Sequence, residues 1–277
     1  MKSISCKGKL IDLKSPKVMG ILNITPDSFF DGGKFQNQHK IISHVEKMLF
    51  EGATFIDVGA YSSRPGAKHI SDQEELNRII PVMELLVSNF PDILISVDTF
   101  RSNVAEHCIS LGASLVNDIS AGSMDDKMFS TIAKLQVPYI IMHMQGIPKI
   151  MQKNPIYNDV VEDLLFYFSK KISELRDLGV NDIISDVGFG FGKNLEHNYQ
   201  LLNKLELFQN LTIPSLVGVS RKSMLFKPLN ISPNEALNAT TSANTIALLK
   251  GANILRVHDV KEAMEAIKIV KLLNNSD

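Results

Sequence analysis

The strongest constraint on the fold is a series of eight short runs of β-forming residues, separated by segments with helical periodicity. The runs are largely apolar rather than alternating, which is typical of strands buried on both faces of a sheet. Helical segments followed by Gly, a residue that ends helices in the left-handed conformation, precede four of them. The pattern predicts an α/β fold, a single (β/α)8 TIM barrel. The runs are Val18–Asn23, Phe55–Gly59, Ile93–Asp98, Ser114–Asp118, Tyr139–His143, Ile183–Asp186, Ser215–Ser220 and Asn253–His258.

The helical segments between the runs carry start signals of their own. Capping boxes at Ser71-x-x-Glu74 and Ser232-x-x-Glu235 predict two helix starts, and residues 159–178 keep apolar positions at helical spacing. Pro81 is expected to kink its helix or displace the start. No linker or low-complexity tract interrupts the pattern, and a TIM barrel needs about 250 residues. We therefore predict one domain over residues 1–277.

Composition excludes several classes of partner. The net charge is −1 with 21% charged residues, so bulk electrostatics favour neither nucleic acid nor an anionic membrane. No apolar run approaches the roughly 20 residues of a membrane span, and no secretory signal is expected. Cys6 and Cys108 lie far apart in sequence without a CxxC pair, which argues against a disulfide framework. A cytoplasmic location is the expectation.

Oxygen-bearing side chains stand at the carboxyl ends of the runs, where TIM-barrel active sites lie. Asp98, Asn117 and Asp186 are the main candidates. They suit metal binding, acid–base chemistry or acceptance of hydrogen bonds from an amidine-like ring edge, and their spacing does not distinguish these roles. Asp57 is the weakest candidate, because a structural hydrogen bond explains it equally well. No HxH or HExxH pattern indicates zinc.

Basic residues follow the last two predicted strands. Arg256 and His258 are two positions apart, so their side chains point the same way, and Lys222 follows the strand before them. The loops after strands 7 and 8 form the recurrent phosphate site of this fold, and Arg holds phosphate oxygens bidentately. A lone Arg at a strand end is usually an ion-paired surface group. Three cations at one barrel mouth instead predict a phosphate or diphosphate ligand.

Two loops at this end, residues 25–38 and 61–71, are long and polar for connectors. They hold Phe29 and Arg64, and we interpret them as lids over the substrate rather than ordinary solvated loops. A glycine-rich segment, residues 188–193, lacks the spacing of a P-loop or a dinucleotide fingerprint. We interpret it as a turn that places Phe191 beside the site. His143 is interpreted as a barrel histidine with satisfied hydrogen bonds rather than a ligand.

The residues also carry a family resemblance. The segment Met19-Gly20-Ile21-Leu22-Asn23-Ile24-Thr25-Pro26-Asp27-Ser28-Phe29 closely resembles the first signature of the bacterial dihydropteroate synthases. Ser62-Ser63-Arg64-Pro65-Gly66 resembles their second loop, although Tyr61 stands where the family more often has an acidic residue. The resemblance spans essentially the whole chain. The other matching segments, in order, are residues 95–99, 116–119, 186–193, 220–223 and 256–259.

The resemblance implies a role for each matching position. The pterin contacts implied are Asp98, Asn117, Ile119, Asp186, Lys222 and Arg256. The p-aminobenzoate contacts are Phe29, Ser63, Pro65, Phe191 and Ser220. The diphosphate contacts are Asn23, Ser63, Arg64, Arg256 and His258. The residues implied in catalysis are Asp27, Arg64, Lys222, Arg256 and His258. Asn23 would offer its amide oxygen to Mg²⁺, an ion that keeps waters and phosphate oxygens as its other ligands.

The reaction that the resemblance implies joins 6-hydroxymethyl-7,8-dihydropterin diphosphate to p-aminobenzoate, releasing diphosphate and giving 7,8-dihydropteroate for folate synthesis. Loss of diphosphate comes first, as in an SN1 reaction, so no protein nucleophile is needed. Sulfonamides are inhibitors of this family, and a homodimer with contacts on late helices is expected. Two other functions are considered, a pterin-dependent methyltransferase domain and a catalytically silent pterin-binding homologue. The cations Arg64, Arg256 and His258 argue against the methyltransferase, which releases no diphosphate.

Overall fold

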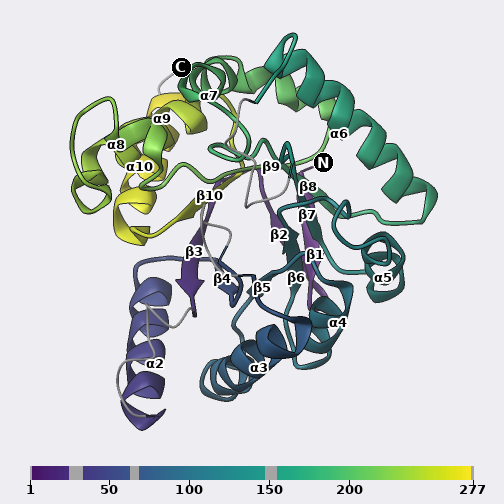
Figure 1. The fold of residues 1–277 in the computed structure, drawn as a ribbon. Coiled ribbons are helices and arrows are strands. Elements are labelled where there is room, and N and C mark those ends of the chain that lie inside the picture. The colour runs from purple at the N-terminus through teal and green to yellow at the C-terminus, as the bar shows by residue number, and fades with distance from the viewer. Residues whose placement is uncertain (1, 25–33, 63–68, 147–154, 276–277) are drawn as a thin grey trace.

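A computed structural model of the chain describes residues 2–24, 34–62, 69–146 and 155–275. Eight parallel strands close into a barrel in the order β10-β3-β4-β5-β6-β7-β8-β9, and helices surround it (Figure 1). The predicted (β/α)8 barrel is therefore confirmed. The strands are β3 (Lys17–Asn23), β4 (Phe55–Gly59), β5 (Ile95–Asp98), β6 (Leu115–Asp118), β7 (Tyr139–Met142), β8 (Ile183–Asp186), β9 (Ser215–Val217) and β10 (Ile254–Val257).

Several strands are shorter than the sequence runs that predict them. The run ending at Ser220 stops pairing at Val217, yet Val219 beyond it is fully buried. At this end of the barrel, residues beyond the last strand pair are therefore still buried, because neighbouring elements cover the loops that follow the strands. Apolar character in sequence reports burial and does not mark where the hydrogen-bond ladder ends.

The helices follow the predicted signals. In α3 the Ser71 side chain accepts a hydrogen bond from the Glu74 N–H, and the helix continues through Pro81, so the proline does not displace its start. Asp159 caps α6 by accepting from two backbone N–H groups. The α-helices are α2 (Lys34–Phe50), α3 (Asp72–Asn89), α4 (Ser102–Ser110), α5 (Met128–Leu135), α6 (Val160–Asp177), α7 (Leu195–Asn203), α8 (Ser223–Phe226), α9 (Leu237–Leu249) and α10 (Val260–Asn274). Two 3₁₀ helices, η1 (Leu205–Leu211) and η2 (Pro233–Glu235), complete the set among the described residues, and the predicted capping box at Ser232 opens η2.

An N-terminal hairpin that the sequence patterns do not predict covers the amino-terminal end of the barrel. Its strands β1 (Ser3–Cys6) and β2 (Lys9–Asp12) are antiparallel. Ile4, Cys6 and Leu13 are buried against inward-facing residues near the starts of the barrel strands. The hairpin therefore closes the bottom of the barrel with apolar side chains.

Two further features bear on the expectations from sequence. Cys6 and Cys108 are both buried free thiols, so the predicted absence of a disulfide between them holds in the structure. The four glycines after helical segments, Gly52, Gly112, Gly179 and Gly251, all have positive φ, as their role in ending helices requires. Among the described residues, no helix combines the length and apolar character needed to cross a membrane.

Candidate active site

The barrel interior changes from apolar to polar along its strands. Phe55, Leu115, Ile184 and Ile254 belong to one buried apolar cluster near the strand starts. Residues two positions further on a strand face the same side. Those residues are polar or charged, and they form a second layer directly above the first. They are Asp57, Asn117, Asp186 and Arg256.

Arg256 is the centre of this polar layer. Its Nε donates to Asp57 Oδ2 at 2.6 Å, and its Nη2 donates to Asp98 Oδ2 at 2.7 Å. Asn117 Nδ2 donates to the same Asp57 oxygen at 3.2 Å. The second oxygen of Asp57 is buried and has no hydrogen-bond partner among the described residues. Strands β4, β5, β6 and β10 are thus tied together by one guanidinium, two carboxylates and one amide.

Burial sets the protonation behaviour of these groups. It raises the pKa of Asp98 to about 7, although the positive charge of Arg256 opposes the shift. Burial likewise raises the pKa of Asp186, against the nearby charge of Lys222. Burial alone would lower the pKa of Arg256, but the carboxylates of Asp57 and Asp98 raise it above its usual value. Arg256 is therefore a permanent cation, while Asp98 changes charge near neutral pH.

Lys222 lies beside the loop that follows β8. Its Nζ donates to the carbonyl of Phe189 and lies 4.8 Å from the ring centroid of Phe191. Burial lowers the pKa of Lys222 to about 8, with the Asp186 carboxylate opposing the shift. Asp186 Oδ1 itself accepts the Gly188 N–H at 2.8 Å. Each of these groups is therefore held at a defined place along the rim.

The loops after β9 and β10 are joined by a side-chain contact. Ser220 Oγ lies 3.0 Å from His258 Nδ1, and it also accepts the backbone N–H of His258 at 3.2 Å. Arg221, the neighbour of Ser220, points elsewhere, since its Nε donates to Asp259 at 3.0 Å. Of the basic residues after the last two strands, Arg221 thus forms an ion pair with Asp259 rather than joining the polar layer.

The structure brings together most of the site residues that it describes. Asp98, Asn117, Asp186 and Arg256 are in or above the polar layer, and Lys222 borders it. Ile119 and Phe191 belong to a small apolar cluster at the same end. Five predicted site residues and parts of both proposed lids lie outside the described residues. Those five are Asp27, Phe29, Ser63, Arg64 and Pro65.

Asn23 ends β3 at the same end of the barrel. It is paired in register with Gly59, which has no side chain, and no hydrogen bond to the Asn23 side chain is found within the described ranges. An amide oxygen at a strand end is a donor that fits Mg²⁺, since this ion takes few protein ligands and keeps water and phosphate oxygens. Within those same ranges no cluster of three His, Cys, Asp or Glu forms a metal cage.

Two buried polar residues have a larger part in the site than the sequence patterns indicate. Asp57 is the weakest candidate from sequence, yet it holds both Arg256 and Asn117. One sequence feature could have indicated this role of Asp57. It lies two residues before Gly59, which ends the strand, and this spacing places both residues on the inner face. Lys193, the last residue of the rejected nucleotide motif, is buried and donates to several carbonyl groups. His143, interpreted as a satisfied barrel histidine, is buried with its Nδ1 3.1 Å from Lys193 Nζ.

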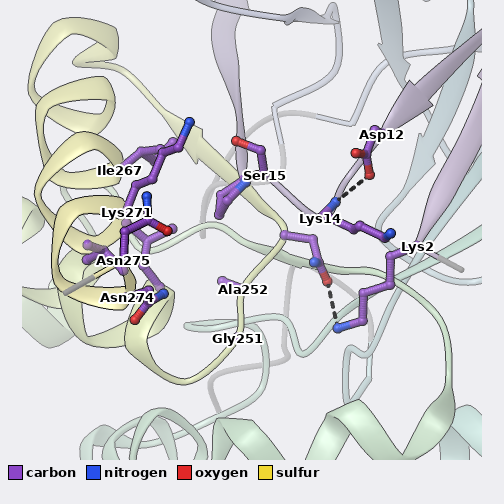
Figure 2. A pocket seen from close by; sticks show the side chains of 14 residues that line it. Lys2, Asp12, Lys14, Ser15, Gly251, Ala252, Ile267, Lys271, Asn274 and Asn275 are labelled. Carbon is purple, nitrogen blue, oxygen red and sulfur yellow. Dashed lines mark hydrogen bonds between the residues drawn. The ribbon is translucent and has the colours of Figure 1, made fainter. Parts of the chain in front are cut away.

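A separate cavity of about 550 Å³ lies at the opposite end of the barrel (Figure 2). The segment around Ser15 and the helix α10 residues Ile267 and Lys271 line it. Lys2 donates to Asn253 at 3.4 Å along one side. None of the predicted site residues lines this cavity, and active sites of TIM barrels lie at the other end.

Comparison with known proteins identifies the chain's relatives. A family model described as "Pterin binding enzyme" matches residues 19–258. The dihydropteroate synthase of Escherichia coli K12 is 44% identical over 267 residues, which cover 96% of this chain and 94% of that protein. The chain therefore belongs to the pterin-binding enzyme family, a class consistent with a barrel whose polar layer ends in carboxylates and an amide.

Solved structures show which family of pterin-binding enzymes the chain resembles. The Yersinia pestis dihydropteroate synthase, solved as a complex with a sulfonamide drug, has a TM-score of 0.92 and 43% identity, covering 99% of this chain and 100% of that chain. The Xanthomonas albilineans dihydropteroate synthase with 4-aminobenzoic acid has a TM-score of 0.92 and 34% identity, covering 99% of both chains. Within the pterin-binding enzymes, the chain is thus a member of the dihydropteroate synthase family.

Proposed function

We propose that this chain condenses 6-hydroxymethyl-7,8-dihydropterin diphosphate with p-aminobenzoate to give 7,8-dihydropteroate and diphosphate. The observation that carries the proposal is the polar layer centred on Arg256, in which a fixed cation and buried carboxylates share one barrel end. The relatives named dihydropteroate synthase, at 44% identity over nearly the whole chain, support it. Small-molecule substrates follow from this assignment.

The pterin would lie against the carboxylates and the amide. Asp98, Asn117 and Asp186 come from three adjacent or nearly adjacent strands and offer acceptors for the amino and ring N–H groups of a pterin. The second oxygen of Asp57, which has no partner in the described part of the chain, is one more buried acceptor. Lys222 supplies an ammonium donor at the rim, and Ile119 an apolar wall. Complementary donors and acceptors in a buried site select a ring edge more sharply than apolar contact does.

Arg256 and His258 would face the diphosphate. Cleavage of the carbon–oxygen bond transfers an electron pair to the leaving diphosphate and leaves a methylene cation, which the electron-rich dihydropterin stabilises. The permanent charge of Arg256 is fixed by its bonds to Asp57 and Asp98, so it neutralises the developing charge without reorganising. The amine of p-aminobenzoate then attacks the cation and loses a proton. The chemistry needs no protein nucleophile.

Asn23 would hold Mg²⁺ through its amide oxygen, and the ion would neutralise diphosphate charge when it is bound. Ser220, which is held by His258, and Phe191, which packs beside Lys222, would form the described part of the aminobenzoate pocket. From the sequence resemblance, we assign Phe29, Ser63 and Pro65 to the same pocket. Asp27 and Arg64 would act on the cation and on the diphosphate.

A homodimer is supported by apolar residues on late helices. Ile246 and Leu249 on α9 are 42% and 54% exposed, and Leu272 on α10 is 67% exposed. α9 and α10 pack against each other, so these side chains belong to neighbouring helices on the outside of the barrel (Figure 1). Exposed apolar residues on adjacent helices favour a protein interface. Sedimentation equilibrium tests this, since a monomer at micromolar concentration would contradict it. We also place the protein in the cytoplasm, because its two cysteines are free thiols.

The deciding experiment measures diphosphate release from purified protein with the dihydropterin diphosphate, p-aminobenzoate and Mg²⁺, with dihydropteroate identified by mass. Turnover that requires both substrates is the expected result, and omission of Mg²⁺ tests the metal separately. Binding of the pterin without turnover would identify a silent homologue. Absence of pterin binding would refute the proposed site.

A further inference from the structure

A buried lysine behind the site is not used by the reaction as proposed. Lys193 is 3% exposed. Its Nζ lies 3.2, 3.0 and 2.9 Å from the backbone carbonyl oxygens of His143, Gly188 and Phe191, and 3.1 Å from His143 Nδ1. Among the described residues, none of these hydrogen-bond partners is a carboxylate. An ammonium has three N–H donors and no acceptor, so the three carbonyls can use them all.

Transferring a lysine ammonium from water to a buried position costs free energy, so its burial has to be offset by a structural or functional role. Burial lowers the pKa of Lys193 to about 7, with the Asp186 carboxylate opposing and Lys222 reinforcing the shift. A methionine would fill a similar linear space without that cost. It would, however, remove the Lys193 donor from all three carbonyls. The Gly188 carbonyl would keep the Phe191 N–H at 3.0 Å, but buried carbonyls are rarely left without any partner.

Two of the carbonyls, those of Gly188 and Phe191, belong to a turn that its own sequence does not fix. Gly188, Gly190 and Gly192 all have positive φ, at 70°, 80° and 61°. Glycine gives such a segment access to these angles, but it also gives the segment many alternatives. Lys193 joins both ends of the turn, through Gly188 and Phe191, to His143 at the end of the neighbouring strand β7. Lys193 thus holds the turn together with Asn198, whose Oδ1 accepts the Gly190 N–H at 2.7 Å, and Tyr157, whose hydroxyl donates to the Gly192 carbonyl at 2.7 Å.

The same turn positions Lys222 on its outer side. The Phe189 carbonyl accepts the Lys222 Nζ, and the Phe191 ring lies 4.8 Å from that nitrogen. The Lys222 side chain also passes close to Gly190, since a Cβ added there would lie 3.5 Å from Lys222 Cδ. The ammonium proposed to hold the pterin therefore takes its position from a turn that Lys193 supports from behind.

We propose that Lys193 is a positioning residue, which fixes the turn formed by residues 188–192 and through it the Lys222 ammonium and the Phe191 ring. The inference rests on the proposed function, because it assigns the consequence to pterin and aminobenzoate binding. Lys193 touches neither reacting group. It acts on substrate affinity through residues on the other side of one turn.

The test is a double-mutant cycle on pterin binding. Dissociation constants for the dihydropterin diphosphate are measured by calorimetry for the wild-type chain, Lys193→Met, Lys222→Met and the double variant. Lys193→Met should weaken binding roughly tenfold, within the range measured for coupled neighbours. In the Lys222→Met background the same change should weaken binding less than about twofold, because the ammonium it positions is gone. Equal losses in both backgrounds would overturn the proposal.

Steady-state kinetics separate positioning from a loss of folded protein. A variant that only unfolds in part loses kcat in proportion to the inactive fraction and keeps its KM values. Lys193→Met should instead raise the KM for p-aminobenzoate, because the Phe191 ring moves with the turn. Unchanged KM with reduced kcat would contradict the positioning role. Lys170→Met, a change at an exposed lysine on α6, is the matched control and should behave as wild type.

Two arrangements keep the test decisive. Should Lys193→Met not fold, Lys193→Gln enters the same cycle. Its amide retains two N–H donors at shorter reach, so a smaller but still Lys222-dependent loss is expected. The wild-type chain distinguishes this inference from the proposed function. A wild type that fails to bind the pterin refutes the function itself, whereas a binding wild type with an additive cycle refutes only the role of Lys193.

Discussion

Replacing Asp57 by Asn is the sharpest single test of how the site is held together. Asp57 is fully buried, and its Oδ2 accepts Arg256 Nε at 2.6 Å and Asn117 Nδ2 at 3.2 Å. Asn has the same shape and still offers one oxygen, so the packing and the hydrogen bonds from Arg256 and Asn117 can be kept. The change removes the charge opposite the guanidinium and replaces the second, buried oxygen by an amide NH2, which donates instead of accepting.

The magnitude follows from that lost charge. A hydrogen bond to a charged group contributes about 1.5–3 kcal/mol, roughly twice a neutral one. At about 1.4 kcal/mol per tenfold change, full loss would lower kcat/KM by about 10- to 150-fold. The neutral bond that Asn retains places the expected effect of Asp57→Asn toward the lower end. Arg256 keeps its second carboxylate, Asp98, at 2.7 Å, so binding should be weakened rather than abolished.

The assay is the initial rate of diphosphate release at subsaturating dihydropterin diphosphate, with the melting temperature measured in parallel. Asp92→Asn is the matched control, because the Asp92 side chain is 92% exposed and pairs only with Lys9 among the described residues. In an Arg256→Ala background, Asp57→Asn should have a smaller effect, because only the loss of the second carboxylate oxygen remains. A change in kcat/KM below about twofold, in a variant that folds as wild type, would refute the view that Asp57 orients Arg256.

Three further outcomes are expected. Arg256→Ala should lower kcat/KM on the order of 10²-fold, measured as diphosphate release, because it removes the fixed charge facing the leaving group, and wild-type kinetics would exclude that role. The kcat/KM for the pterin substrate should rise with pH through about 7, as Asp98 ionises into an acceptor, and fall above about 8, as Lys222 loses its proton. In an Asp98→Asn variant, kcat/KM should no longer fall at acid pH. If it still falls, the titrating group is not Asp98. Gly188→Ala should abolish pterin binding, because its Cβ would lie 2.2 Å from a backbone carbonyl oxygen, whereas Gly179→Ala, with nothing within 4 Å, should only reduce the urea midpoint.

The N-terminal hairpin and the polar layer show where sequence patterns stop short. Residues 3–12 are too short and too polar in part to stand out as strands, and their pairing depends on the barrel they cover. Asp57 gains its role from its buried position beside Arg256 and Asn117, and that position is set by strand register and barrel closure. Register in turn depends on contacts between distant residues, such as Arg256 opposite Asp57, 199 positions apart.

Lys193 illustrates the same limit from another side. In sequence it ends a glycine-rich segment that fails as a nucleotide loop, and a lysine after glycines is usually exposed. Only folding brings His143 from the preceding strand beside it and buries its ammonium among carbonyl oxygens. Hydrogen-bond partners 50 positions apart leave no periodic signal in the chain.

The sequence by itself determined the barrel. Each of the eight buried strands and the helices between them has a local pattern of apolar residues, caps and glycines, and this pattern does not depend on distant contacts. It also placed oxygen-bearing and basic side chains at the correct end of that barrel, since the carboxyl ends of parallel strands share one face. The tertiary structure alone decided which of those groups touch, which pKa values burial moves, and which residues hold the others in place. These properties depend on distances and on exclusion of water, and both arise only when the strands close into a ring.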